Sequence, residues 1–284
     1  MTVPDARPEP VDEVAAGSLA HRVARAVVLP AGAGMARMMV ERNLMASRRN
    51  WPVLLSGFFE PVFYLFSLGI GLGALVHSVP VDGRPVAYPV FVAPALLAAS
   101  AMNGAVYDST LNVFFKLKYL KLYDAVLATP LGPRDVAVGE ICWAQLRGGV
   151  YATMFVLVML LLGVLPSWWA VLALPAALVV GLAFAAVGMA ATTYMRSWQD
   201  FDLVNLAVLP MFLFSATFYP LSVYPRSLQW VVEVTPLYHA VELIRALTLG
   251  LVGWPVLGHL FYLVALGLAG VLVAARRLER LLLR

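Results

Sequence analysis

Five polar or ionisable residues fall within stretches of this sequence that are otherwise apolar: Glu60, Asn103, Asp108, Glu140 and Arg147. A charge inside an apolar block is costly unless it serves a function or has a partner, so these positions suggest ion coupling or internal ion pairs. Glu60, directly before Pro61, is a candidate proton site, and a structural pairing is the equal alternative. Asn103 and Asp108 could line an internal path or lie near an end that water reaches.

Glu140 and Arg147 are seven residues apart, so they share one face of a helix. We expect them to pair with each other, or with the segment that precedes them, rather than to relay protons. Glu60, Asp108 and Glu140 are a sparse set of carboxylates for ion coupling. The two halves of the chain also show no repeat of the kind that many secondary transporters carry.

Motifs of common enzymes are absent from the sequence. None of the three lysines, Lys116, Lys118 and Lys121, follows a glycine, so there is no phosphate-binding loop. HExxH, CxxC and GxSxG are missing too. We therefore expect no enzyme activity and no directly bound metal or cofactor. Any active work would draw on a partner protein or an ion gradient.

The composition predicts an all-α integral membrane protein. Of the 284 residues, 62% are hydrophobic and 13% are charged, and the mean hydropathy is +0.84. The net charge of +4 is spread over the loop ends, which argues against a nucleic-acid partner. Apolar blocks predict six spans, at about residues 51–76, 89–113, 136–164, 170–195, 203–219 and 256–275. A short polar loop, residues 77–88, would turn at Asp82-Gly83.

The amino-terminal region lacks the apolar core of a signal peptide. Residues 1–33 are predicted to be a disordered cytoplasmic extension. Residues 34–50 place four methionines near one face and arginines away from it, which predicts an amphipathic helix at the surface of membrane lipid. This helix could serve topology, bind a partner, or do both.

The distribution of basic residues predicts the orientation. With both termini in the cytoplasm, only four of the 20 Lys and Arg fall elsewhere: Arg84, Arg226 and Arg245 outside, and Arg147 within a span. The opposite orientation would place nearly all positive charge outside, so we reject it.

A basic segment between the second and third spans is predicted to form a short cytoplasmic helix over residues 117–128, LKYLKLYDAVLA. Leu117, Leu120, Leu127 and either Tyr123 or Asp124 recur at three- and four-residue spacing, so they would share a face. Thr129-Pro130 would end the helix. The segment is either a docking surface or an ordinary loop that is basic for topology alone.

The region before the last span predicts a helical hairpin on the outer side. Tyr219-Pro220 would stop the fifth span, and two amphipathic segments follow, the second beginning at Pro236. Both are too short or too polar to span alone, which favours a re-entrant or interfacial pair. His239, Glu242 and Arg245 would form one polar stripe. A metal site is not expected there, because a third ligand is lacking.

Three segments in this order resemble a known family: LYDAVLATPLGPRDVAVGEICWAQLRG, FLFSATFYPLSVYP and TPLYHAVELIR. They are similar to the permease subunits of ABC-2 type ABC transporters, over roughly residues 35–275. The most similar branch contains nodulation-factor lipo-oligosaccharide exporter permeases and actinobacterial drug-efflux permeases. The extension of residues 1–33 is not covered by these motifs.

The resemblance implies an export permease of the bacterial inner membrane that moves a lipid-like or amphiphilic substrate or a drug. Its partners would be a second permease subunit, as homodimer or related heterodimer, and a separate ATPase subunit that binds ATP and Mg²⁺. The first, second and fifth spans would form the path, and residues 34–50 would be a second ATPase contact. The coupling helix, at about residues 115–127, would dock through Leu117, Leu120, Tyr123, Asp124, Leu127, Thr129 and Pro130. A proton-coupled transporter using Glu60 and a non-transporting scaffold are the alternatives.

Overall fold

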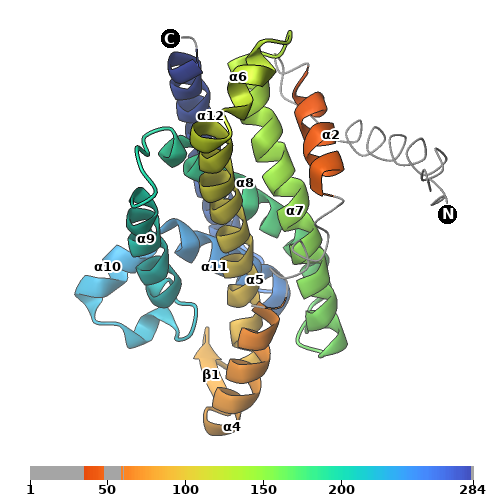
Figure 1. Ribbon diagram of the computed structural model, residues 1–284. Coiled ribbons are helices and arrows are strands. Elements are labelled where there is room, and N and C mark those ends of the chain that lie inside the picture. Colours follow the sequence, from red (N-terminus) through yellow and green to blue (C-terminus); the bar gives the residue numbers. More distant parts are fainter. Residues whose placement is uncertain (1–34, 48–58, 60, 283–284) are drawn as a thin grey trace, which may run out of the picture.

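The computed structural model of the chain describes residues 35–47, 59 and 61–282. The extension of residues 1–33, most of the first half of the first predicted span and Glu60 therefore lie outside the described residues. The first described helix, α2 (Ala36–Ser47), corresponds to the predicted amphipathic helix. It packs along α7 (Pro133–Leu161), near the end of the molecule where the carboxyl terminus lies (Figure 1).

Four helices of the described chain are long and apolar enough to cross a membrane: Tyr88–Tyr119, Pro133–Leu161, Trp168–Thr192 and Trp254–Leu282. The first is α5 (Tyr88–Tyr107) continued by π-helical turns. The third joins a 3-10 turn to α8 (Ala173–Thr192), and the fourth is α12 (Trp254–Leu282). Their helical form pairs the backbone groups between the helix ends within the segment, as lipid requires. The chain is thus a helical membrane protein.

Two further apolar helices are shorter. They are Pro61–Leu75, at the first predicted span, and α9 (Asp200–Phe214), at the fifth. The expectation that Tyr219-Pro220 stops the fifth helix was wrong. The helix ends at Phe214, and Ala216 takes a left-handed backbone conformation with φ of 54°. The chain then turns through a bend before either Tyr-Pro pair is reached.

The predicted loop at residues 77–88 is a β-hairpin, so the fold is not purely α-helical. Strand β1 (Ser78–Val81) pairs antiparallel with β2 (Arg84–Ala87). Asp82 and Gly83 have φ of 48° and 74°, which gives the left-handed turn that matches the twist of a two-residue hairpin. The hairpin lies at the opposite end of the molecule from the carboxyl terminus (Figure 1).

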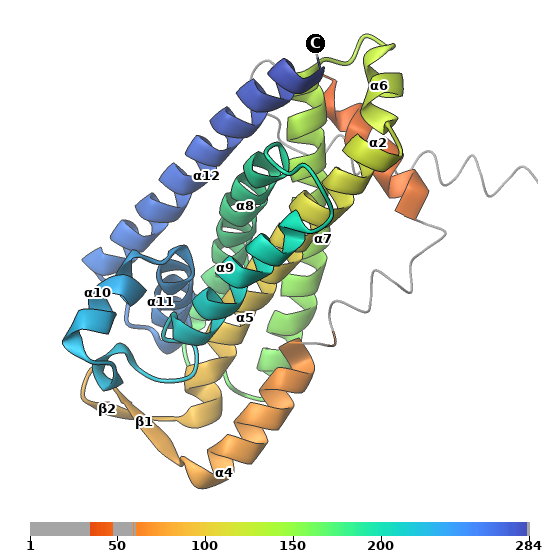
Figure 2. The ribbon, with the colours of Figure 1, turned by 60° about the vertical axis from the view of Figure 1, so that its left-hand side comes forward.

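Small residues let α8 occupy the centre of the bundle (Figure 2). A Cβ added to Gly270 of α12 would lie 2.8 Å from the backbone carbon of Ala186. At Gly267 it would lie 3.3 Å from the Cα of Ala183. Glycine and alanine at such crossings allow backbones to approach closely, which is how membrane helices gain packing energy without a hydrophobic driving force.

The predicted coupling helix, residues 115–127, is not one helix. The turn Phe115–Tyr119 continues the long helix that begins at Tyr88, and α6 (Leu122–Leu127) starts anew. Lys121 between them has φ of 46°. Because of this break, Leu120 and Tyr123 do not share a face. Leu120 is 68% exposed whereas Tyr123 is 1% exposed.

Two helices precede α12, where the external hairpin was predicted. They are α10 (Arg226–Val234) and α11 (Pro236–Leu249), separated by Thr235. The face of α11 that carries Leu237, Val241 and Ile244 is buried against the bundle. In contrast, most of α10 is exposed, with Trp230, Val231 and Val234 uncovered.

Candidate functional site

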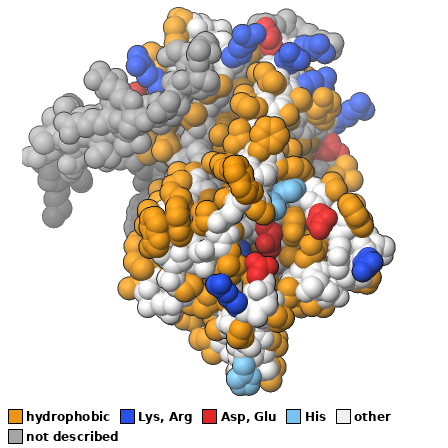
Figure 3. Space-filling model, turned by 180° about the vertical axis from the view of Figure 1, so that it is seen from behind, with side chains coloured by type: hydrophobic (Ala, Val, Ile, Leu, Met, Phe, Trp, Pro, Cys, Tyr) orange, Lys and Arg blue, Asp and Glu red, His pale blue; other side chains and the backbone are white. Residues whose placement is uncertain are grey.

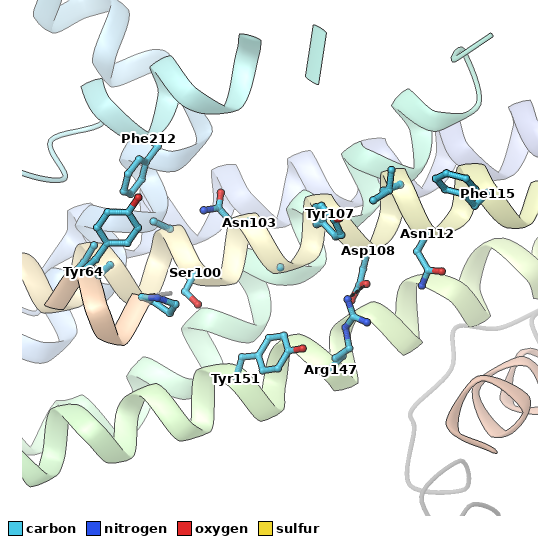
Figure 4. A pocket seen from close by; sticks show the side chains of 15 residues that line it. Tyr64, Ser100, Asn103, Tyr107, Asp108, Asn112, Phe115, Arg147, Tyr151 and Phe212 are labelled. Carbon is cyan, nitrogen blue, oxygen red and sulfur yellow. Dashed lines mark hydrogen bonds and ion pairs between the residues drawn. The ribbon is translucent and has the colours of Figure 1, made fainter. Parts of the chain in front are cut away.

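A cavity of about 660 Å³ opens between the helix Pro61–Leu75, α5, α7 and α9. Aromatic side chains from all four helices line it together with a few polar groups (Figure 4). The aromatic residues are Tyr64, Tyr107, Phe115, Tyr151 and Phe212, and the polar ones include Ser100, Asn103, Asp108, Asn112 and Arg147. Such a mixed lining suits a molecule that has both apolar and polar parts.

Three of the predicted path residues, Asn103, Asp108 and Arg147, meet in this cavity. Arg147 of α7 forms an ion pair with the buried Asp108 of the neighbouring long helix, and Figure 4 shows the two side chains facing each other. Arg147 Nε and Asn103 Oδ1 are buried without a hydrogen-bond partner among the described residues. These atoms are therefore available to a polar group that enters the cavity.

Glu140 does not line this cavity, and it does not pair with Arg147. It pairs instead with Lys116, with Nζ and Oε2 2.7 Å apart and side-chain exposures of 11% and 2%. We expected Glu140 to pair either with Arg147 or with the segment that precedes α7. The structure shows the second pairing, through Lys116. The two pairs, Lys116–Glu140 and Asp108–Arg147, both join the helix Tyr88–Tyr119 to α7, which runs in the opposite direction.

Helix α2 takes part in the same buried cluster through Asn43. Its amide nitrogen donates to Glu140 Oε2 over 3.1 Å, and Lys116 Nζ donates to Asn43 Oδ1 over 3.2 Å. The close approach of α2 and α7 depends on Gly139, where an added Cβ would lie 2.5 Å from the Cβ of Met39. The cluster thus ties together α2, α7 and the end of the helix that leads to α6.

Tyr123 brings α6 to this cluster. Its hydroxyl and Glu140 Oε1 are buried and lack a hydrogen bond of normal geometry among the described residues. Burial, together with the nearby Glu140 carboxylate, raises the pKa of Tyr123 well above its usual range. Tyr123 is therefore a neutral, inward-facing anchor and not part of an exposed surface.

The other predicted coupling residues differ in exposure. Leu120, Asp124, Thr129 and Pro130 are exposed, whereas Leu117 and Leu127 are partly buried. Helix α2 lies toward the same end of the molecule as α6 (Figure 1), and its Met38 and Met45 side chains are exposed. This end thus presents a mixed apolar and polar surface.

The three residues of the predicted polar stripe, His239, Glu242 and Arg245, do not form one cluster. Arg245 pairs with Glu242, whereas His239 contacts His259. Arg245 is buried, donates to Glu242 over 2.6 Å and to the carbonyl of Ala216 over 2.8 Å, and lies 4.0 Å from the centre of the Phe91 ring. His239 turns toward α12, with its Nδ1 2.8 Å from Nδ1 of His259. Among the described residues, no three His, Cys, Asp or Glu side chains converge as metal ligands.

The remaining predicted hairpin residues lie at turns. Pro236 is the first residue of α11. Tyr219 is exposed in the bend after α9, and Pro220 precedes a single 3-10 turn, Leu221–Val223.

This chain belongs to the ABC-2 type transporter family, whose model matches residues 36–249. It is a multi-pass membrane permease of that family. Its relatives include Nodulation protein J of Rhizobium leguminosarum bv. viciae, 34% identical over 225 residues that cover 78% of this chain and 85% of that protein. Nodulation protein J of Sinorhizobium fredii is 33% identical over 261 residues, which cover 91% of this chain and 98% of that protein.

Sequence reasoning missed Lys116, Asn43, Tyr151 and His259. One signal could have identified Lys116. Asp108 and Lys116 are separated by about two helical turns on one helix, and Glu140 and Arg147 by about two turns on the next. In antiparallel helices, that spacing brings each charge opposite its counter-ion.

Proposed function

We propose that this chain is the membrane subunit of an ATP-driven exporter, and that an amphiphilic substrate passes through the cavity at Asp108 and Arg147. The observation that carries this proposal is the lining of that cavity, where aromatic side chains surround an ion pair and unpartnered polar atoms. Membership of the family supports export. The lining suits lipids, glycolipids or hydrophobic drugs alike.

The proposed topology has six spans with both termini in the cytoplasm. The helix Pro61–Leu75 and α9 would be the visible parts of the first and fifth spans. In the space-filling view most visible Lys and Arg gather at the upper end, where Figure 1 places α6 and the carboxyl terminus (Figure 3). The rule that cytoplasmic loops are positive favours that end as the cytoplasmic one. Helices α10 and α11 would then form the external re-entrant pair.

A separate ATPase subunit would supply the energy, because the sequence contains no phosphate-binding loop. It would bind ATP and Mg²⁺ and dock on the exposed side of α6 and α2. Movement of α6 would reach the bundle through Tyr123 and the Lys116–Glu140–Asn43 cluster. A second permease subunit would complete the path, and packing changes in the first and fifth spans would open it outward.

Co-expression with a candidate ABC ATPase subunit tests this proposal. We expect Leu120→Asp, which changes an exposed residue, to abolish both co-purification and ATP-dependent efflux from vesicles while leaving thermal unfolding unchanged. Met159→Leu, buried far from α6, is the matched control and should retain both. Survival of ATPase binding and export in Leu120→Asp would refute the docking assignment.

The same vesicles separate the two alternatives. Uptake driven by a pH gradient without ATP, and lost in Glu60→Gln, would favour a proton-coupled transporter. ATPase binding without movement of any amphiphile would favour a scaffold.

A further inference from the structure

Helix α9 contacts the rest of the described chain through aromatic side chains near its two ends and through the partly buried Val208 and Met211. Phe201 packs edge-on against Phe114, with ring centres 5.4 Å apart. Phe212 packs against Tyr64, with ring centres 6.0 Å apart. No residue of α9 is fully buried. Helix α9 is therefore only partly covered by the rest of the described chain.

The space behind α9 is a second cavity, also of about 660 Å³, which we call the α9 groove. Its long walls are apolar and come from α8 and α9, including Phe184, Val187, Ala191, Leu203, Val204 and Val208. Thr110 also lines it, but its hydroxyl donates to the carbonyl of Val106 over 2.6 Å. An apolar space of this size loses dispersion contacts on every wall if nothing occupies it.

The remaining polar side chains of the α9 groove gather at one end. Tyr194, Arg196 and Asp200 line that end. Asp200 Oδ2 accepts from the backbone N–H groups of Arg196 and Ser197 over 2.6 and 3.1 Å, and these bonds hold the pKa of Asp200 below its usual range. The carboxylate is thus engaged by the backbone. The described residues form no ion pair with the Arg196 guanidinium.

A second arginine lies at the same end. The Arg277 guanidinium is 4.1 Å from the centre of the Tyr194 ring, and its Nε is buried without a hydrogen-bond partner among the described residues. An apolar slot that ends beside two arginines has the charge pattern of a site for a chain with an anionic head.

We propose that the α9 groove binds one acyl chain of an anionic phospholipid from the cytoplasmic leaflet, with the phosphate beside Arg196. The proposed topology places this end of the groove at that leaflet, where anionic lipids and basic side chains attract each other. Its volume falls within the range of about 300–1,000 Å³ typical of ligand sites. Both walls come from the same chain, so a second copy is not needed to form the groove. The proposal rests on the proposed topology and not on export.

Photo-crosslinking of the full chain in nanodiscs tests the proposal. The probe is phosphatidylglycerol with a diazirine in one acyl chain, carried in unlabelled phosphatidylcholine, and labelled peptides are mapped by mass spectrometry. We expect labels on α8 and α9 that excess unlabelled phosphatidylglycerol removes and excess phosphatidylcholine does not. This arm needs no variant, so it does not depend on how a mutant folds.

Two pairs of variants locate the site. Ala207→Trp fills the groove and should lose the label, whereas Leu206→Trp, an exposed neighbour that does not line the groove, should keep it. Arg196→Gln should reduce the preference for phosphatidylglycerol over phosphatidylcholine by about fivefold, the worth of one basic contact near the surface. Arg280→Gln, an exposed arginine on α12 outside the groove lining, should change that preference less.

Three results would overturn the proposal. They are equal labelling of Ala207→Trp and wild type, no preference for phosphatidylglycerol, and no lipid label on α8 and α9, as expected if a second copy of the chain fills the groove. None depends on export, because a protein that fails to transport can still bind the lipid. Conversely, loss of the lipid site would leave the ATPase-binding and efflux tests above intact as measures of the proposed function.

Discussion

Lys116 Nζ lies 2.7 Å from Glu140 Oε2 in a buried ion pair that joins the helix Tyr88–Tyr119 to α7. Glu140→Gln should destabilise the protein by about 3–5 kcal/mol, because it leaves the Lys116 ammonium buried without a counter-charge. Thermal unfolding in detergent measures this loss. The double variant Lys116→Met with Glu140→Leu should recover most of it, since neither charge then remains.

A surface ion pair between α7 and α12 provides the control. Arg134 and Glu279 are 3.8 Å apart, with side-chain exposures of 69% and 43%. Arg134→Gln should cost no more than about 1 kcal/mol. If Glu140→Gln lowered the stability by no more than Arg134→Gln, the Lys116–Glu140 pair would not stabilise the fold.

The contact of α2 with α7 depends on the absence of a side chain at Gly139. Gly139→Ala would place a methyl group 2.5 Å from the Cβ of Met39 and 2.9 Å from the carbonyl oxygen of Ala36. We expect a loss of about 1–3 kcal/mol and faster proteolysis of α2. Gly148→Ala on the same helix meets nothing within 4 Å. It should instead stabilise the helix by about 0.5–1 kcal/mol, so equal behaviour of the two variants would argue against close packing here.

The Asp108–Arg147 pair should matter for transport beyond its effect on stability. Arg147→Gln strands a buried carboxylate, so both stability and efflux should fall. Adding Asp108→Asn removes that carboxylate, and the double variant should regain stability without regaining efflux. Parallel unfolding and efflux measurements decide this. Full efflux by the stable double variant would mean that the substrate does not use the pair.

Arg245 holds α11 to the bend after α9 and to α5. Arg245→Met keeps a long side chain but removes the bonds to Glu242 and Ala216 and the contact with Phe91. We expect a loss of about 3–5 kcal/mol, since Glu242 and a buried carbonyl lose their partner. Arg226→Met, at the exposed start of α10, should change stability by less than about 0.5 kcal/mol. Similar stability losses in Arg245→Met and Arg226→Met would show that the buried contacts of Arg245 add little to the stability of the fold.

The long apolar helices could be predicted from the sequence, because a span needs only an uninterrupted apolar run. The predicted spans at residues 89–113, 136–164, 170–195 and 256–275 all correspond to such helices. The break at Lys121 could not be predicted, since a left-handed lysine has no sequence signature. That single residue separates Leu120 from Tyr123 and divides the predicted coupling face.

The candidate site was only partly predictable. Asn103, Asp108 and Arg147 stood out as polar residues in apolar runs, and they do meet in one cavity. Lys116 was overlooked because lysines near a predicted span end usually face water, whereas its partner Glu140 draws it inward. The aromatic lining from Tyr64 and Phe212 depends on how distant helices pack, which local periodicity does not determine.

The two ion pairs between the helix Tyr88–Tyr119 and α7 restrict how these helices can move. Asp108–Arg147 and Lys116–Glu140 lie roughly 11 Å apart along the helix axes, as two turns of rise require. These two contacts oppose sliding of one helix along the other, because any shift would stretch both pairs at once. A swing about the line that connects the pairs would keep both of them. The arrangement of the two pairs therefore favours a hinge rotation between the helices over sliding along their axes.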